Sequence, residues 1–169
     1  THLKKRLTFL LSKFVSKNIL VIECGAGSGH MSKFINKLGY NVLSVDHSLW
    51  SIKICKFVGL SSQLFDMKIP QNLNIKNKAI VTLGSMEQLG TQWEPFYNFL
   101  CEQHPYLVIH MEPFFECYRP QDQRIKKYHL RQNYLRGYFP VISKNKILHF
   151  QHSTVGHKLH SYSELVWKP

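Results

Sequence analysis

Short apolar runs alternate with amphipathic segments along most of this chain of 169 residues. Apolar runs bounded by glycine, proline or polar residues are typical of strands buried in a parallel sheet. They predict strands at 18–23, 41–45, 62–65, 79–83 and 106–110. The segments between them place apolar residues at helical spacing. They predict helices at 3–17, 29–38, 48–58 and 93–103.

The last third of the chain departs from this alternation. A basic and aromatic stretch at 121–139 predicts a helix, and two further strands are expected at 146–150 and 162–167. The 151–161 connection is rich in glycine, serine and histidine. It is too short for a helical crossover, which takes about a dozen residues. The final strand should therefore run antiparallel.

Together these elements predict an α/β fold: a doubly wound, seven-stranded, mostly parallel sheet with an antiparallel last strand and helices on both faces. The sequence contains no repeat and no second apolar pattern, so we expect one domain over residues 1–169. Because the chain begins at Thr1 rather than at Met, we also expect a truncated start before the helix at 3–17.

The first predicted strand leads into a glycine-rich turn, which is how doubly wound sheets build nucleotide pockets. Glu23 precedes three alternating glycines, Gly25, Gly27 and Gly29, in the pattern E-x-G-x-G-x-G. The dinucleotide pattern G-x-G-x-x-G needs a glycine where His30 stands. This spelling favours S-adenosylmethionine (SAM) over NAD as the ligand.

Half of the chain's ten acidic residues lie at or just beyond the end of a predicted strand. They are Glu23, Asp46, Asp66, Glu87 and Glu112. The carboxyl ends of parallel strands form the ligand-binding edge of such a sheet. Asp46 stands where ribose hydroxyls are bound, and Asp66 could accept a hydrogen bond from the adenine amino group. Glu23 could hold either the glycine turn or an ammonium group of the ligand.

On these motifs the chain resembles the class I SAM-dependent methyltransferases over essentially its whole length. The glycine turn matches the family's loop, Asp46 its ribose-binding acid, and Asp66 the acid beside adenine. The segment 86–89 is similar to the family's Glu-His-Leu/Ile segment, with Gln88 in place of the usual His. The resemblance implies SAM as cofactor. It implies the binding residues Glu23, Gly25, Ala26, Gly27, Gly29, Asp46, His47, Asp66, Gly84 and Glu87.

The methyl acceptor is less well defined by the sequence. No Asn/Asp-Pro-Pro-Tyr/Phe motif follows the fourth strand and no Pro-Cys pair occurs, which disfavours methylation of nucleic-acid bases. The candidate catalytic residues are His110 and Glu112 at the end of the fifth strand, and His129 in the basic segment. We expect a small hydroxylated or anionic acceptor, such as a sugar, a surface-polymer precursor or a secondary-metabolite precursor. A catalytically silent SAM-binding partner domain and an RNA methyltransferase remain as alternatives.

Charge and composition add further expectations. The formal net charge is +12, which attracts polyanions, anionic membranes or phosphorylated substrates, although scattered lysines also suit ordinary solvated faces. The four cysteines are far apart and form no C-x-x-C pair, as expected of reduced thiols in a cytoplasmic protein. No apolar run approaches the roughly 18 residues that a membrane span needs.

The C-terminal tail contains two histidine pairs, each with members three residues apart. They are His149 with His152, and His157 with His160. Because this region reads as strand and loop, without a Cys or acidic cluster, we expect no metal site. A loop that lines the acceptor pocket is the favoured interpretation.

Overall fold

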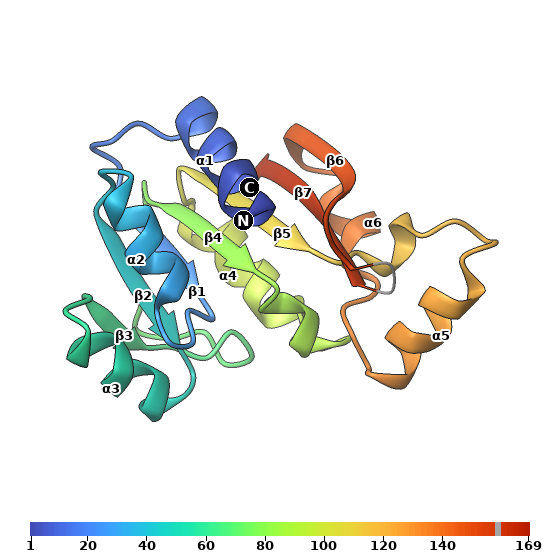
Figure 1. Ribbon diagram of the computed structural model, residues 1–169, viewed down its shortest axis with the longest axis horizontal. Helices are drawn as coiled ribbons and strands as arrows, with labels where there is room; N and C mark the ends of the chain where they lie inside the picture. The colour runs from blue at the N-terminus through green and yellow to red at the C-terminus, as the bar shows by residue number, and fades with distance from the viewer. Residues whose placement is uncertain (158–159) are drawn as a thin grey trace.

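The computed structural model describes residues 1–157 and 160–169 (Figure 1). Seven strands form one sheet in the order β3-β2-β1-β4-β5-β7-β6. The strands are β1 (Val21–Cys24), β2 (Val42–Asp46), β3 (Ser62–Leu64), β4 (Ala79–Leu83), β5 (Leu107–Glu112), β6 (Lys146–His157) and β7 (His160–Lys168). Strand β1 pairs in parallel with β2 and β4, whereas β7 runs antiparallel to β5 and β6. The predicted sheet and its antiparallel last strand are confirmed.

Helices cover both faces of the sheet. They are α1 (His2–Phe14), α2 (His30–Lys37), α3 (Leu49–Phe57), α4 (Glu94–Gln103), α5 (Gln123–Arg131) and α6 (Tyr138–Ile142). Two short 3₁₀ helices, η1 (Met86–Leu89) and η2 (Phe115–Cys117), follow β4 and β5. Helices α1 and α2 lie in front of the sheet in Figure 1, and α4 lies behind it. Among the described residues, no helix has the length and apolar character needed to cross a membrane.

Two apolar layers hold the helices against the sheet. On one face Leu11 of α1 and Ile35 of α2 pack with Val81 of β4. On the other face Phe96 of α4 and Trp167 of β7 belong to a second buried cluster. Strands β4 and β5 are therefore buried on both faces, which explains why they appear as continuous apolar runs in the sequence.

Two predicted elements differ most from the structure in their bounds. The helix expected at 121–139 is broken into α5 and α6, because the chain enters the left-handed region at Asn133 (φ 52°) and again at Gly137 (φ 78°). Strand β6 extends to His157, beyond the predicted end at 150, because pairing with β7 continues up to His157↔His160.

Candidate functional site

The glycine turn between β1 and α2 has three residues with positive φ: Gly25 (76°), Gly27 (54°) and Gly29 (74°). A Cβ on Gly25 would lie 2.3 Å from the Ser85 Cβ, and one on Gly29 would lie 2.4 Å from a methyl group of Leu60. A Cβ on Gly27 would meet nothing within 4 Å. The first and third glycines therefore allow close packing, and the second leaves its backbone open to a ligand.

Asp46, at the end of β2, joins this turn to the start of α3. One carboxylate oxygen accepts a hydrogen bond from the amide of Gly27 (2.9 Å), and the other accepts from the amide of Ser48 (2.8 Å). Ser48 in turn caps α3 through the amide of Ser51. Because a carboxylate offers about four lone-pair sites, Asp46 can still accept hydrogen bonds from a ligand.

A cavity of about 350 Å³ opens at this edge of the sheet. Six of its lining residues are predicted ones: Gly25, Gly27, Asp46, His47, Asp66 and Gly84. The other six were missed by sequence reasoning: Phe65, Met67, Lys68, Ser85, Gln88 and Leu89. All six lie within two residues of a predicted site residue, so proximity to the strand ends was the signal that could have found them. Small-molecule pockets typically measure about 300–1,000 Å³.

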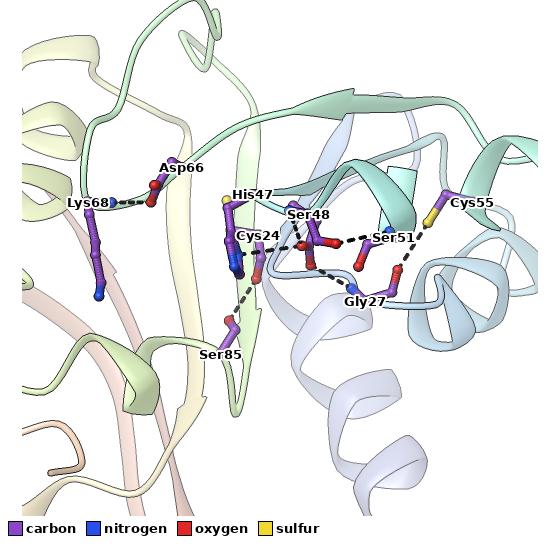
Figure 2. A network of polar contacts seen from close by, with 10 residues as sticks. Cys24, Gly27, His47, Ser48, Ser51, Cys55, Asp66, Lys68 and Ser85 are labelled. Atoms are coloured by element: carbon purple, nitrogen blue, oxygen red, sulfur yellow. Dashed lines mark hydrogen bonds and ion pairs between the residues drawn. The ribbon is translucent and has the colours of Figure 1, made fainter. Parts of the chain in front are cut away.

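The far wall of the cavity follows β3. The Asp66 carboxylate accepts a hydrogen bond from the Lys68 amide (2.8 Å), which closes a tight turn at the cavity edge (Figure 2). Phe65 is buried against the rings of Phe96 and Phe99, at 6.2 and 5.6 Å between centroids. The wall therefore combines an acidic acceptor with an immobilised aromatic side chain.

Ser85 links the loops that follow β1 and β4. Its hydroxyl donates to the carbonyl oxygen of Cys24 (2.7 Å), as Figure 2 shows. The amides of Ser85, Met86 and Glu87 all donate to the Glu112 carboxylate, at 3.0, 3.1 and 3.3 Å. Glu112 is fully buried. Burial, together with the negative charge of Glu87, raises the pKa of Glu112 to about 7.

Glu23 also lies behind the cavity rather than in its lining. It is buried and accepts a hydrogen bond from the Ser32 hydroxyl, which itself accepts one from Ser44 (2.7 Å). Burial raises the pKa of Glu23 to about 7. The other predicted binding residues outside the lining are Ala26, Gly29 and Glu87. Of the two roles considered for Glu23, its contacts fit support of the turn.

The structure does not bring the three predicted catalytic residues to the cavity. His110 is fully buried between the Thr82 hydroxyl (2.8 Å) and the Tyr138 hydroxyl (2.9 Å), and burial lowers its pKa to about 3. His129 is buried among aromatic rings, the nearest being Tyr118 at 4.9 Å between centroids. None of the three lines the cavity, so their catalytic role stays a prediction, and the contacts of Glu112 are those of a residue that positions the loop after β4.

Tyr162 of β7 is a further residue that sequence reasoning missed. A Cβ on Gly84 would lie 2.4 Å from the Tyr162 hydroxyl, so this phenol is packed against the cavity wall. Burial and the negative charge of Glu87 raise the pKa of Tyr162, which keeps the phenol protonated and able to donate a hydrogen bond. Its position depends on the β6–β7 hairpin, and no local sequence motif predicts that Tyr162 lies beside Gly84.

The first two C-terminal histidines, His149 and His152, contact polar side chains of β7. His149 lies 3.2 Å from the Glu164 carboxylate, and His152 lies 2.9 Å from the Ser163 hydroxyl. The side chains of His157 and His160 lie outside the described part of the structure. Among the described residues, no group of three His, Cys, Asp or Glu side chains could hold a metal ion.

No protein-family model matches the chain, and no curated protein matches its sequence. A SAM-dependent methyltransferase from Methanosarcina mazei superposes with a TM-score of 0.70 at 9% identity, over 94% of this chain and 96% of that one. The chain has the methyltransferase fold.

Two other solved structures with the methyltransferase fold differ widely in substrate. Magnesium protoporphyrin IX methyltransferase from Synechocystis, with bound S-adenosylhomocysteine (SAH), gives a TM-score of 0.71 at 13% identity, over 98% of this chain and 81% of that one. A tRNA (uracil-54, C5)-methyltransferase from Pyrococcus abyssi, also with SAH, gives 0.57 at 14%, over 98% and 38%. The methyltransferase fold alone therefore leaves the acceptor undetermined.

Proposed function

We propose that this protein is a SAM-dependent methyltransferase and that the cavity beside the glycine turn binds SAM. The observation that carries the proposal is the pairing of Gly27 and Asp46. A Cβ on Gly27 would meet no protein atom within 4 Å, so the backbone there is open to a ligand. Asp46, which accepts a hydrogen bond from the Gly27 amide, also lines the cavity. This arrangement fits a ligand that combines a ribose diol with a group needing close backbone approach.

The cavity residues have separable roles in this proposal. Asp46 accepts hydrogen bonds from the ribose hydroxyls, and Asp66 accepts one from the adenine amino group. Phe65 gives the base an apolar wall. When bound, SAM supplies a methyl group on a positively charged sulfur. Gly84 and Ser85, held by Glu112 and Cys24, form the wall beyond which the acceptor would approach.

We further propose a small hydroxylated or anionic acceptor. The segment that follows β5 supports this, because it is rich in basic side chains: Arg119, Arg124, Lys126, Lys127, Arg131 and Arg136. The partly buried Tyr162 phenol against Gly84 adds a hydrogen-bond donor at the same edge. The four cysteines are all free, which fits the reducing cytoplasm that we predict.

Calorimetric titration with SAM, SAH and NAD tests the proposed cofactor. We expect SAM and SAH to bind and NAD not to bind. Asp46→Asn keeps the side-chain shape and removes the charge, so SAM affinity should fall at least about 10-fold, as for a lost hydrogen bond to a charged group. Asp122→Asn, at the start of α5 and outside the cavity lining, is the matched control. Binding of NAD without SAM, or equal affinity in the two variants, would overturn the proposal.

A further inference from the structure

The outward face of α3 is apolar and exposed. Trp50 is 72% exposed and Phe57 92%, and Leu49, Ile54 and Val58 are exposed beside them. Trp50, Ile54 and Phe57 recur at the three- and four-residue spacing that places side chains on one side of a helix. Ile52 and Cys55, on the opposite side, are buried. Helix α3 therefore presents an apolar face to each side, and only the inner one is covered by the described chain.

The exposed face continues onto the edge of the sheet. Strand β3 is the outermost strand next to β2, and its Leu64 is also exposed. We call Leu49, Trp50, Ile54, Phe57, Val58 and Leu64 the α3 patch. It holds six of the eleven large apolar side chains that are exposed among the described residues. Scattered exposed apolar side chains are ordinary, whereas a concentration of this kind marks an interaction surface.

The helices on the same face of the sheet as the α3 patch carry charge of one sign. The connections β1–α2–β2 and β2–α3–β3 run in the same direction along the sheet, so right-handed crossovers place α2 and α3 on the same face, which α1 also covers. These three helices contain no acidic residue. Their basic residues are Lys4, Lys5, Arg6, Lys13, Lys33, Lys37, Lys53 and Lys56.

Two of these lysines belong to α3 itself. The Lys53 ammonium group lies 4.6 Å from the centre of the Trp50 ring, and Lys56 follows one turn later. Both are exposed. A helix with Trp, Phe and aliphatic side chains outward and lysines at their border matches the composition of helices that lie in the interface of an anionic membrane.

We propose that the α3 patch docks this protein on the surface of an anionic lipid bilayer. The apolar side chains enter the interfacial region, and the lysines of α1, α2 and α3 contact lipid headgroups. Four of the six patch residues are aliphatic, which favours lipid over RNA, because bases stack on aromatic rings. A second copy of the chain would bring two acid-free basic faces together, which charge repulsion opposes.

Co-sedimentation with vesicles tests the docking surface. The full chain should bind vesicles of equal parts phosphatidylserine and phosphatidylcholine, and should not bind phosphatidylcholine alone. The double variant Trp50→Ala/Phe57→Ala should lose at least about 10-fold in binding, because both side chains bury apolar surface in lipid. Leu130→Ala, at an exposed apolar position on α5, is the control and should bind as the unaltered protein does.

Charge and fluorescence provide two independent measurements. Lys53→Glu/Lys56→Glu should weaken binding to the anionic vesicles, whereas Lys144→Glu, next to α6, should have little effect. Trp167 is fully buried and Trp93 partly buried. Emission of the exposed Trp50 should therefore shift to shorter wavelength when vesicles are added, and this shift should be absent in Trp50→Phe.

Three outcomes would overturn the docking proposal. The first is absence of binding to anionic vesicles. The second is binding that the apolar double variant leaves unchanged. The third is occupation of the patch by something else: binding of single-stranded RNA without vesicle binding, or a dimer that Trp50→Ala/Phe57→Ala dissociates. SAM titration of the double variant is a separate measurement, so failure of docking and failure of the proposed enzyme function can be told apart.

Discussion

Gly27→Ala tests most directly whether the cavity is a cofactor site. Gly27 has φ 54°, in the left-handed region, and a Cβ there would meet nothing within 4 Å. The substitution therefore creates no clash inside the protein. Its effect on folding is the backbone strain of a left-handed alanine, about 1–2 kcal/mol. The new methyl group points into space that a bound ligand would fill.

Gly59→Ala is the matched control. Gly59 follows α3, has φ 80°, and a Cβ there would also meet nothing within 4 Å. It does not line the cavity. Both variants should lose the same 1–2 kcal/mol or so of unfolding free energy. Gly25→Ala provides the opposite extreme, because its Cβ would lie 2.3 Å from the Ser85 Cβ and the fold would have to shift.

Urea unfolding measures the free energy of unfolding of each variant, and calorimetry measures its SAM affinity. We expect Gly27→Ala to reduce SAM affinity at least about 10-fold, which corresponds to about 1.4 kcal/mol. Gly59→Ala should bind SAM as the unaltered protein does. Equal SAM affinities for the two variants would refute the reasoning, since they share the strain and differ only in access to the cavity.

Three further variants test the residues behind the cavity. Glu112→Gln replaces two acceptor oxygens by one, so well above pH 7 it should lose about 1–3 kcal/mol of stability and weaken SAM binding; a variant that keeps both would contradict the positioning role. Glu23 holds a proton between pH 4.5 and about 7 in the folded state only, so stability should fall as pH rises through this window. Unfolding measured across the window should show Glu23→Gln gaining up to about 3 kcal/mol relative to the unaltered protein, and parallel curves would exclude this account. His110→Leu removes the partner of two buried hydroxyls and should lower stability while SAM affinity is retained; lost turnover at unchanged stability would instead restore His110 as a catalytic residue.

The sheet was predictable because its signals are local. The central strands β1, β4 and β5 are buried on both faces and therefore appear as apolar runs. The antiparallel direction of β7 followed from the short connection before it, because a parallel return needs a helix. Asp46 was predictable for the same reason, since its position depends only on the end of β2 and the adjacent turn.

The burial of His110 and Glu112 could not be predicted, because it depends on distant parts of the chain. The end of a strand predicts that His110 and Glu112 lie near the ligand-binding edge. It does not predict how deeply their side chains are buried. His110 is enclosed by Tyr138, and Glu112 is occupied by amides of the loop after β4. The break between α5 and α6 likewise depends on Gly90, whose carbonyl accepts from the Arg136 amide.

The contact between Glu112 and the loop after β4 also constrains how the cavity is assembled during folding. The carboxylate and the amides it holds are 25 to 27 residues apart along the chain. The loop that carries Gly84 and Ser85 therefore cannot reach its final shape until β5 has joined β4. Contacts of long sequence separation form late, after the entropy of closing the intervening chain has been lost. The cavity can therefore bind its ligand only after the central sheet is complete. A partly folded chain in which β5 has not paired with β4 should not bind the ligand.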